Sequence, residues 1–308
     1  MTAPASARRT IAVVNSAVNL VVLTIIVVLL AFAGFALWDS HQVFQAADRS
    51  HYAVYEPAKA GGKSFQELQA LNPEVMAWLT VYGTNISYPV TQAADNSTYL
   101  NTDAEGRYSL AGALFLDYRN RGDFSDFNSI IYGHHMDKAV MFGQVGSFRE
   151  PAMFDEHRYG DLYFDGTNHG IEFFAFIHAD AYDDAVYNLH LRDADRRAYL
   201  DNLLAQATHT RDIGVTTTDR LVLLSTCSAT STNGRDILVG RITGQTYPDP
   251  FPAESAGNGK WLTGVDGRPG WPAITWWLAG GGLLVVAALV LLLTLRKKTC
   301  RQAKRGTS

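Results

Sequence analysis

The sequence predicts a mainly β domain, a closed barrel or a sandwich, held between two membrane-spanning helices. Two uncharged apolar runs, one near each end of the 308-residue chain, predict the helices. Between them, a helical beginning gives way to short apolar runs separated by Gly, Pro, Asn and Asp, a pattern typical of many short strands. This middle region holds about 230 residues, which is enough for one domain with its own core.

The two uncharged runs, Ala17–Leu37 and Ile274–Leu295, each hold about 21 residues. At roughly 1.5 Å per residue they match a hydrocarbon core of about 30 Å. Basic residues flank both runs on their outer sides: Arg8, Arg9, Arg296, Lys297, Lys298, Arg301, Lys304 and Arg305. This bias predicts a two-pass protein of the cell membrane, with both termini in the cytoplasm and the middle domain outside. A cleaved signal peptide is the alternative for the first run, because Ala31-Phe32-Ala33 resembles a cleavage site.

The charge of the chain is concentrated by region. The net charge is −4, and the flanks 1–38 and 273–308 hold eight basic and no acidic residues, so residues 39–272 carry −12. An acidic domain argues against nucleic acid as a partner and suits a protein that works among cell-wall polymers.

We divide the chain into seven segments. They are a cytoplasmic N-terminus (1–16), a transmembrane helix (17–38), a helical extracytoplasmic region (39–80), a barrel (81–248), a linker rich in Pro and Gly (249–272), a second transmembrane helix (273–295) and a basic cytoplasmic tail (296–308).

The region 39–79 is expected to be helical. Ser64-Phe65-Gln66-Glu67 has the form of a capping box, and apolar residues recur from there at spacings of three or four, at Phe65, Leu68, Leu71, Val75 and Leu79.

From Val81 onward the pattern changes to strands. We expect them at Ile86–Val90, Ala113–Asp117, Ser129–Tyr132, Ile171–His178, Arg220–Cys227 and Asp236–Thr243. One helix, Asp195–Ala207, interrupts them, and its expected apolar face consists of Tyr199, Leu200, Leu203 and Leu204.

The chain has two cysteines, Cys227 at the end of an apolar run and Cys300 in the basic tail. With a membrane span between them, the two sulfurs lie on opposite sides and cannot pair. An unpaired cysteine outside the cell is either an inert buried thiol or a nucleophile.

The residues around Cys227 favour the nucleophile. The loop 228–234 ends in an Asn-Gly turn signal, and Arg235 then opens the next strand. If the two strands pair antiparallel, Cys227 and Arg235 project at the same end of the sheet. A guanidinium beside a sulfur favours the thiolate and stabilises a developing oxyanion. A cysteine nucleophile also needs an imidazole, and the best-placed candidate is His134, where a strand runs into Gly133-His134-His135.

Plainer interpretations exist for each residue taken alone. The other seven histidines (His41, His51, His157, His169, His178, His190 and His209) occur singly, as surface or core polar residues usually do. A metal site at His134-His135 lacks further ligands at a suitable spacing. Arg235 alone could be a solvated charge at a strand end, and Cys227 alone an inert buried thiol. The argument depends on the three residues together.

The motifs around these residues resemble those of the sortase family, and most closely its class B. Leu223-Leu224-Ser225-Thr226-Cys227, with Arg235 eight positions later and Gly133-His134 about ninety residues earlier, is similar to the sortase pattern. Further similar stretches are 72–79 (NPEVMAWL), 83–90 (GTNISYPV), 113–120 (ALFLDYRN), 132–136 (YGHHM) and 141–143 (MFG). The resemblance covers about residues 64–245.

The resemblance implies an eight-stranded sortase barrel with N-terminal helices and one helix before the cysteine strand. It also implies a cysteine transpeptidase that acts on secreted proteins carrying a C-terminal sorting signal. Cys227 would attack a backbone carbonyl, His134 would protonate the leaving amine, and Arg235 would hold the substrate and the oxyanion. Ser225 and Thr226, next to the cysteine, would bind the substrate. The acyl group would pass to an amine of a peptidoglycan precursor, and neither a metal nor an organic cofactor is expected.

Two features depart from class B. Leu223 replaces the Thr that begins the family pattern, and we expect altered packing there rather than lost chemistry. The second span is commoner in class C, the pilus polymerases, which also carry an Asp-Pro-aromatic lid. Asp249-Pro250-Phe251 has that form but follows the barrel, whereas the lid precedes it, so we interpret it as a coincidence.

Two other functions stay open. A pilus-polymerising sortase would use a pilin lysine as acceptor in place of a cell-wall amine. A non-catalytic envelope scaffold would keep the fold, but its Cys227 would not react with a thiol-directed substrate analogue.

Overall fold

The computed structural model describes residues 4–57, 64–228 and 233–251, which form parts of two units. Residues up to His41 belong to the first unit and residues 42–258 to the second. Helix α1 (Ala5–Ala47) contains, at Thr10–Ala47, the one described segment that is long and apolar enough to cross a membrane. Its length and composition fit a membrane anchor or a signal sequence. The predicted second span (273–295), the tail (296–308) and all but the first three residues of the predicted linker lie outside the described residues.

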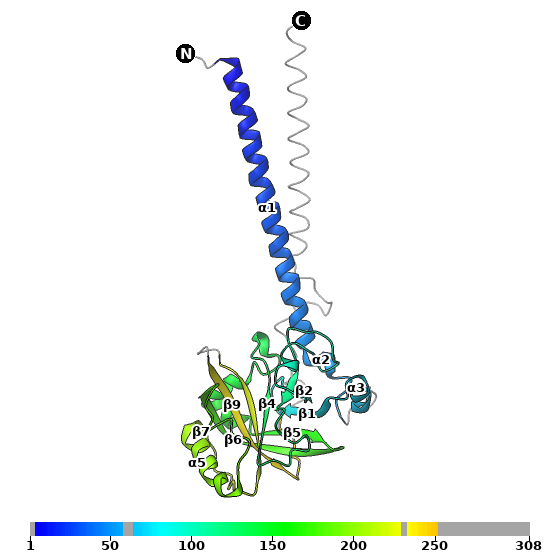
Figure 1. Cartoon of the computed structure of the whole chain (residues 1–308), viewed down its shortest axis with the longest axis vertical. Coiled ribbons are helices and arrows are strands. Elements are labelled where there is room, and N and C mark those ends of the chain that lie inside the picture. Colours follow the sequence, from blue (N-terminus) through cyan, green and yellow to red (C-terminus); the bar gives the residue numbers. More distant parts are fainter. Residues whose placement is uncertain (1–3, 58–63, 229–232, 252–308) are drawn as a thin grey trace. The chain divides into compact units, whose positions relative to one another are not determined.

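The second unit is built around a closed β-barrel (Figure 1). Eight strands form the ring in the order β5-β1-β2-β3-β4-β8-β9-β6, and a pairing of β5 with β6 closes it. A ninth strand, β7, adds to the outer edge of β6. The strand bounds are β1 Val75–Val81, β2 Ser87–Thr91, β3 Leu114–Leu116, β4 Asn128–Tyr132, β5 Tyr159–Phe164, β6 Thr167–Asp180, β7 Ala207–Thr210, β8 Arg220–Cys227 and β9 Gly234–Thr243. The predicted eight-stranded barrel is confirmed.

The middle of strand β8, residues 221–224, is a continuous apolar run because both of its faces are covered. Its alternate residues Val222 and Leu224 belong to the core inside the barrel. Leu221 and Leu223 belong to a second core outside the barrel wall, where helix α5 packs. A strand buried on both faces reads as a continuous apolar run rather than as an alternation. Leu223, the departure from the sortase pattern, is fully buried in this outer core.

The helices are short apart from α1. They are α2 Arg49–Tyr52, α3 Phe65–Leu71, α4 Pro151–Glu156 and α5 Arg196–Gln206, with 3-10 turns η1 Thr98–Leu100, η2 Asp137–Ala139, η3 Val145–Arg149 and η4 Asp193–Asp195. The predicted capping box is present, since Ser64 Oγ accepts from Glu67 N and Glu67 Oε2 accepts from Ser64 N. The predicted α5 face is right for Tyr199, Leu200 and Leu203, whereas Leu204 is exposed.

The helical prediction for residues 72–79 is wrong. Helix α3 ends at Leu71, which is 59% exposed, and Val75 and Leu79 lie in strand β1 with their side chains buried. Pro73 explains the break, because a proline cannot continue a helix and forces the preceding residue into extended backbone, as seen at Asn72. Strand β1 then pairs with β2 on one side and β5 on the other. The predicted boundary at residues 80 and 81 therefore falls at the end of β1.

Strands β5 and β7 were not predicted, and β6 is longer than the predicted 171–178. Strands β5 and β6 form a hairpin whose turn is Asp165-Gly166, with positive φ at both residues. This is the backbone of a two-residue hairpin, for which an Asp-Gly pair is a strong sequence signal.

The segment after β9 folds along the end of the barrel remote from Cys227. Tyr247 stacks on Tyr159 with ring centroids 4.1 Å apart, and its hydroxyl lies 3.4 Å from Glu172, the register partner of Arg241. Arg241 is six residues along β9 from Arg235, or roughly 20 Å. Asp249-Pro250-Phe251 therefore does not cover the cysteine end of the barrel.

Candidate active site

Cys227 and Arg235 face each other across two neighbouring strands. Cys227 is the last residue of β8, Arg235 is the second of β9, and the two are register partners in an antiparallel pair. Such partners place their side chains on the same face of the sheet. Cys227 is exposed and forms no disulfide within the described part of the chain. Arg235 is half-buried, and its Nη1 donates to the carbonyl of Gly234 at 3.0 Å, which leaves other N–H groups of the guanidinium for an anion.

Strand β4 brings His134 to the same end of the barrel. β4 runs parallel to β8 with Tyr132 opposite Ser225, and Gly133 N donates to the carbonyl of Ser225. His134 thus lies two residues beyond Tyr132, just as Cys227 lies two residues beyond Ser225. Glycine is required at position 133 because a Cβ there would lie 2.7 Å from the Phe142 ring. In the Gly-His motif, the glycine thus lets the backbone pass close to the core, and the histidine that follows carries the imidazole.

The two adjacent histidines have different surroundings. His134 Nε2 lies 2.7 Å from the carbonyl oxygen of Leu100. A carbonyl only accepts, so Nε2 carries a proton and Nδ1 is the nitrogen that can exchange the second one. His135 instead forms a backbone bridge with Met141, and its Nδ1 is buried with no hydrogen-bond partner in the described part of the chain. The imidazole of His134 is therefore the one whose tautomer is fixed.

Ser225 and Thr226 are almost completely buried. Ser225 Oγ hydrogen-bonds the Tyr187 hydroxyl at 2.9 Å. Thr226 is the register partner of Asp236 and alternates with Cys227, so its side chain points into the barrel rather than toward the thiol. Its hydroxyl has no partner among the described residues. Substrate binding by these two residues stays a prediction.

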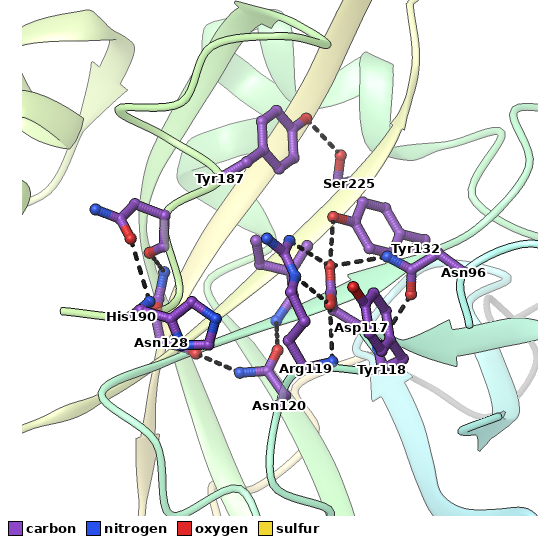
Figure 2. A network of polar contacts seen from close by, with 12 residues as sticks. Asn96, Asp117, Tyr118, Arg119, Asn120, Asn128, Tyr132, Tyr187, His190 and Ser225 are labelled. Carbon is purple, nitrogen blue, oxygen red and sulfur yellow. Dashed lines mark hydrogen bonds and ion pairs between the residues drawn. The ribbon is translucent and has the colours of Figure 1, made fainter. Parts of the chain in front are cut away.

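A partly buried polar network centred on the fully buried Asp117 supports this wall of the site (Figure 2). Asp117, at the end of β3, accepts hydrogen bonds from Arg119, Asn96 and the Tyr132 hydroxyl, and Tyr132 stacks on Tyr187 with ring centroids 6.4 Å apart. Burial alone would raise the pKa of Asp117, but the hydrogen bonds from Arg119 and Asn96 outweigh it and hold the pKa below its usual value. The network fixes β3 and β4 next to the cysteine strand.

Tyr187 is the site residue that sequence reasoning missed. It comes from the segment between β6 and α5, where no motif marks it. Burial raises the pKa of its hydroxyl to about 12, while the hydrogen bond to Ser225 and the charge of Arg235 act in the opposite direction and Cys227 adds to the rise. The thiol and the guanidinium thus both affect the pKa of the tyrosine hydroxyl.

This arrangement at one end of a closed eight-stranded barrel is typical of a thiol-dependent acyl-transfer enzyme of sortase type. No protein-family model matches the chain. Sortase B of Listeria monocytogenes is 31% identical over 179 residues, which cover 58% of this chain and 73% of that protein. The chain therefore belongs to the sortase family, with class B as the class it resembles most, and is a cysteine transpeptidase.

Two solved structures extend this result. Sortase B from the type II pilus of Streptococcus pneumoniae is 47% identical, with a TM-score of 0.53 over 59% of this chain and all of that one. A class B sortase of Streptococcus pyogenes involved in pilus biogenesis is 39% identical, with a TM-score of 0.54 over 58% of this chain and 97% of that one.

Proposed function

We propose that this chain is a membrane-anchored sortase that cleaves a C-terminal sorting signal of secreted proteins and transfers the acyl group to a cell-wall amine. The observation that carries the assignment of roles is the register pair Cys227–Arg235, with His134 brought beside it by β4. Helix α1, with a second span at 273–295, would hold the barrel outside the cell with both termini in the cytoplasm. Both the substrate protein and a lipid-linked acceptor are presented at that membrane surface.

The reaction has two balanced halves. The Cys227 thiolate attacks the carbonyl carbon of the scissile peptide bond, and Arg235 donates hydrogen bonds to the resulting oxyanion. The C–N bond breaks, the amine leaves with a proton from His134, and a thioester remains on Cys227. An acceptor amine then attacks the thioester, its proton passes to the His134 imidazole, and the C–S bond breaks to release the product and the thiolate.

Substitution of the two adjacent histidines, one at a time, distinguishes the proposed catalytic residue from its structural neighbour. We expect His134→Ala to remove activity and His135→Ala to keep much of it, because only His134 has its ring proton directed to a backbone carbonyl. General acid–base assistance typically contributes roughly a hundredfold to ten-thousandfold to the rate. The measurement is the rate of release of the leaving peptide from a labelled sorting-signal substrate. Greater damage from His135→Ala would reverse the two roles.

Pilus assembly is the second candidate function. It is favoured by the type II pilus sortase at 47% identity and by the pilus-biogenesis sortase at 39%. In that reaction the acceptor is a pilin lysine rather than a cell-wall amine, while the acylation of Cys227 is unchanged.

Competition between the two acceptors decides between these functions. The pre-formed acyl-enzyme is offered equal concentrations of a peptidoglycan-precursor amine and of a folded pilin domain with an exposed lysine, and the products are identified by mass spectrometry. We expect the cell-wall amine to be the main acceptor, because a small flexible amine needs no docking surface on the barrel. Predominant transfer to the pilin lysine would assign the chain to pilus assembly.

A further inference from the structure

An ion cluster with a buried carboxylate and two partly exposed basic partners lies directly behind the proposed oxyanion-binding arginine. Asp236 follows Arg235 in β9 and is 3% exposed. Its Oδ1 accepts from Arg149 Nη2 at 2.8 Å and from His178 Nδ1 at 2.9 Å. Arg149 belongs to η3 and His178 to β6, so one carboxylate ties together three elements that are distant in the sequence.

The position of Asp236 in β9 connects the ion cluster to Arg235. Adjacent residues of a strand point to opposite faces, so Arg235 points to the thiol side and Asp236 into the mouth of the barrel. Further along the same inward row, Leu238 and Ile242 lie in the apolar core. Gly146 of η3 packs against the carboxylate so closely that a Cβ there would lie 2.8 Å from Oδ2. Among the inward-facing positions of β9, the charged residue therefore stands at the one next to Arg235, and the apolar residues follow it.

Stability alone gives little reason for a carboxylate at this position. Removing a carboxylate from water costs about as much as its attraction to a cation returns, so a buried carboxylate in an ion pair is weak evidence for a stabilising role. Its directional hydrogen bonds instead fix geometry. Cys227 is the last residue of β8 and Arg235 the second of β9, so both lie near strand ends, where fraying is expected, and Ser228 N donates to the carbonyl of Gly234 there. Arg149 Nη2 also lies 3.5 Å from Ser228 Oγ, so the same cation reaches both strand ends.

We propose that Asp236, held by Arg149 and His178, is a positioning residue that fixes Arg235 opposite Cys227 for transition-state stabilisation. The inference rests on the proposed function, in which Arg235 binds the oxyanion. A displacement of about 1 Å in a catalytic group can cost on the order of a hundredfold in rate. A residue that fixes the backbone next to Arg235 can therefore have a large effect on the rate.

The fold supplies a matched control at the other end of the same strands. Glu172 of β6 is 6% exposed and binds Arg158 at 2.8 Å and Arg241 of β9 at 2.9 Å. Both clusters join β6 to β9 through a buried carboxylate with two basic partners. Only the Asp236 cluster adjoins the site. Equal damage to the two clusters should therefore destabilise the barrel similarly but affect catalysis at one end alone.

The test measures single-turnover acylation and thermal unfolding of the full-length chain in detergent, with a labelled sorting-signal peptide. We expect Asp236→Asn to lower the acylation rate constant about ten- to a hundredfold with little change in KM, and Glu172→Gln to leave it within about twofold. In an Arg235→Ala background Asp236→Asn should add less than about threefold, because residues that act as a unit are not additive. His178→Phe, which removes one donor only, serves if Asp236→Asn does not fold, and should lower the rate in the same way.

Two outcomes would overturn the inference separately from the function. Wild-type acylation by a folded Asp236→Asn or His178→Phe variant would do so, as would an undiminished Asp236→Asn effect in the Arg235→Ala background. Full activity of Arg235→Ala itself would instead remove the proposed role of Arg235, and the inference with it.

Discussion

The Cys227→Ala variant is expected to lose both cleavage and transfer entirely while the barrel stays folded. No acyl thioester can form without the sulfur, and the oxygen-free methyl side chain of alanine offers no replacement nucleophile. Cys227 is exposed, so its removal leaves no cavity in either core. The measurements are release of the leaving peptide and the mass of the covalent acyl-enzyme, with thermal unfolding as the check on folding.

Cys300→Ala is the matched control for this experiment. Cys300 is the one other cysteine of the sequence and lies in the predicted cytoplasmic tail, so its loss should leave the activity unchanged. Turnover above background in the Cys227→Ala variant would contradict the assignment of the nucleophile. Failure of wild-type Cys227 to react with a thiol-directed substrate analogue would favour the non-catalytic scaffold.

The second large effect is expected at Arg235. A planar guanidinium gives two parallel donors to an oxyanion, which the point charge of a lysine cannot reproduce. Removal of one oxyanion donor typically costs about a hundredfold to a thousandfold in rate. We therefore expect Arg235→Lys to lose activity by about that factor although the charge is conserved. Single-turnover acylation by the full-length chain measures it.

Arg241→Lys controls for the loss of a guanidinium in the same strand. Arg241 binds Glu172 through Nη2 at 2.9 Å, at the end of the barrel remote from Cys227. One such contact to a carboxylate is within the reach of a lysine, so we expect near wild-type acylation. If Arg235→Lys were as active as Arg241→Lys, Arg235 would be only a charge at a strand end.

The barrel was predictable where a strand is a continuous apolar run. Arg220–Cys227 was predicted with its observed bounds, because an apolar run covered on both faces contrasts sharply with the polar loops beside it. Residues 72–79 were misread as helix because Val75 and Leu79 happen to continue the spacing of α3. The information that decides against a helix there, beyond Pro73, is pairing with β2 and β5, which no local pattern contains.

The site was predictable to the extent that motifs mark it. The antiparallel pairing expected for their strands predicted a shared sheet end for Cys227 and Arg235, while Gly133-His134 was marked by a strand running into a Gly turn and by the sortase pattern. The strand registers place all three at one end of the barrel. Tyr187 and Asp236 carry no such mark. Their neighbours come from other elements, Ser225 for the tyrosine and Arg149 and His178 for the aspartate, so only the folded chain reveals them.

The parallel pairing of β4 with β8 links the reactivity of the thiol to the order in which the chain folds. It joins segments about ninety residues apart, so the entropy of closing a long loop must be overcome before His134 reaches Cys227. The β5–β6 hairpin, by contrast, closes through a two-residue turn. Contacts between residues far apart in the sequence are the ones that slow folding, and they form only as the chain folds. A nascent chain thus carries an ordinary cysteine, and the reactive centre comes into existence only with the completed barrel.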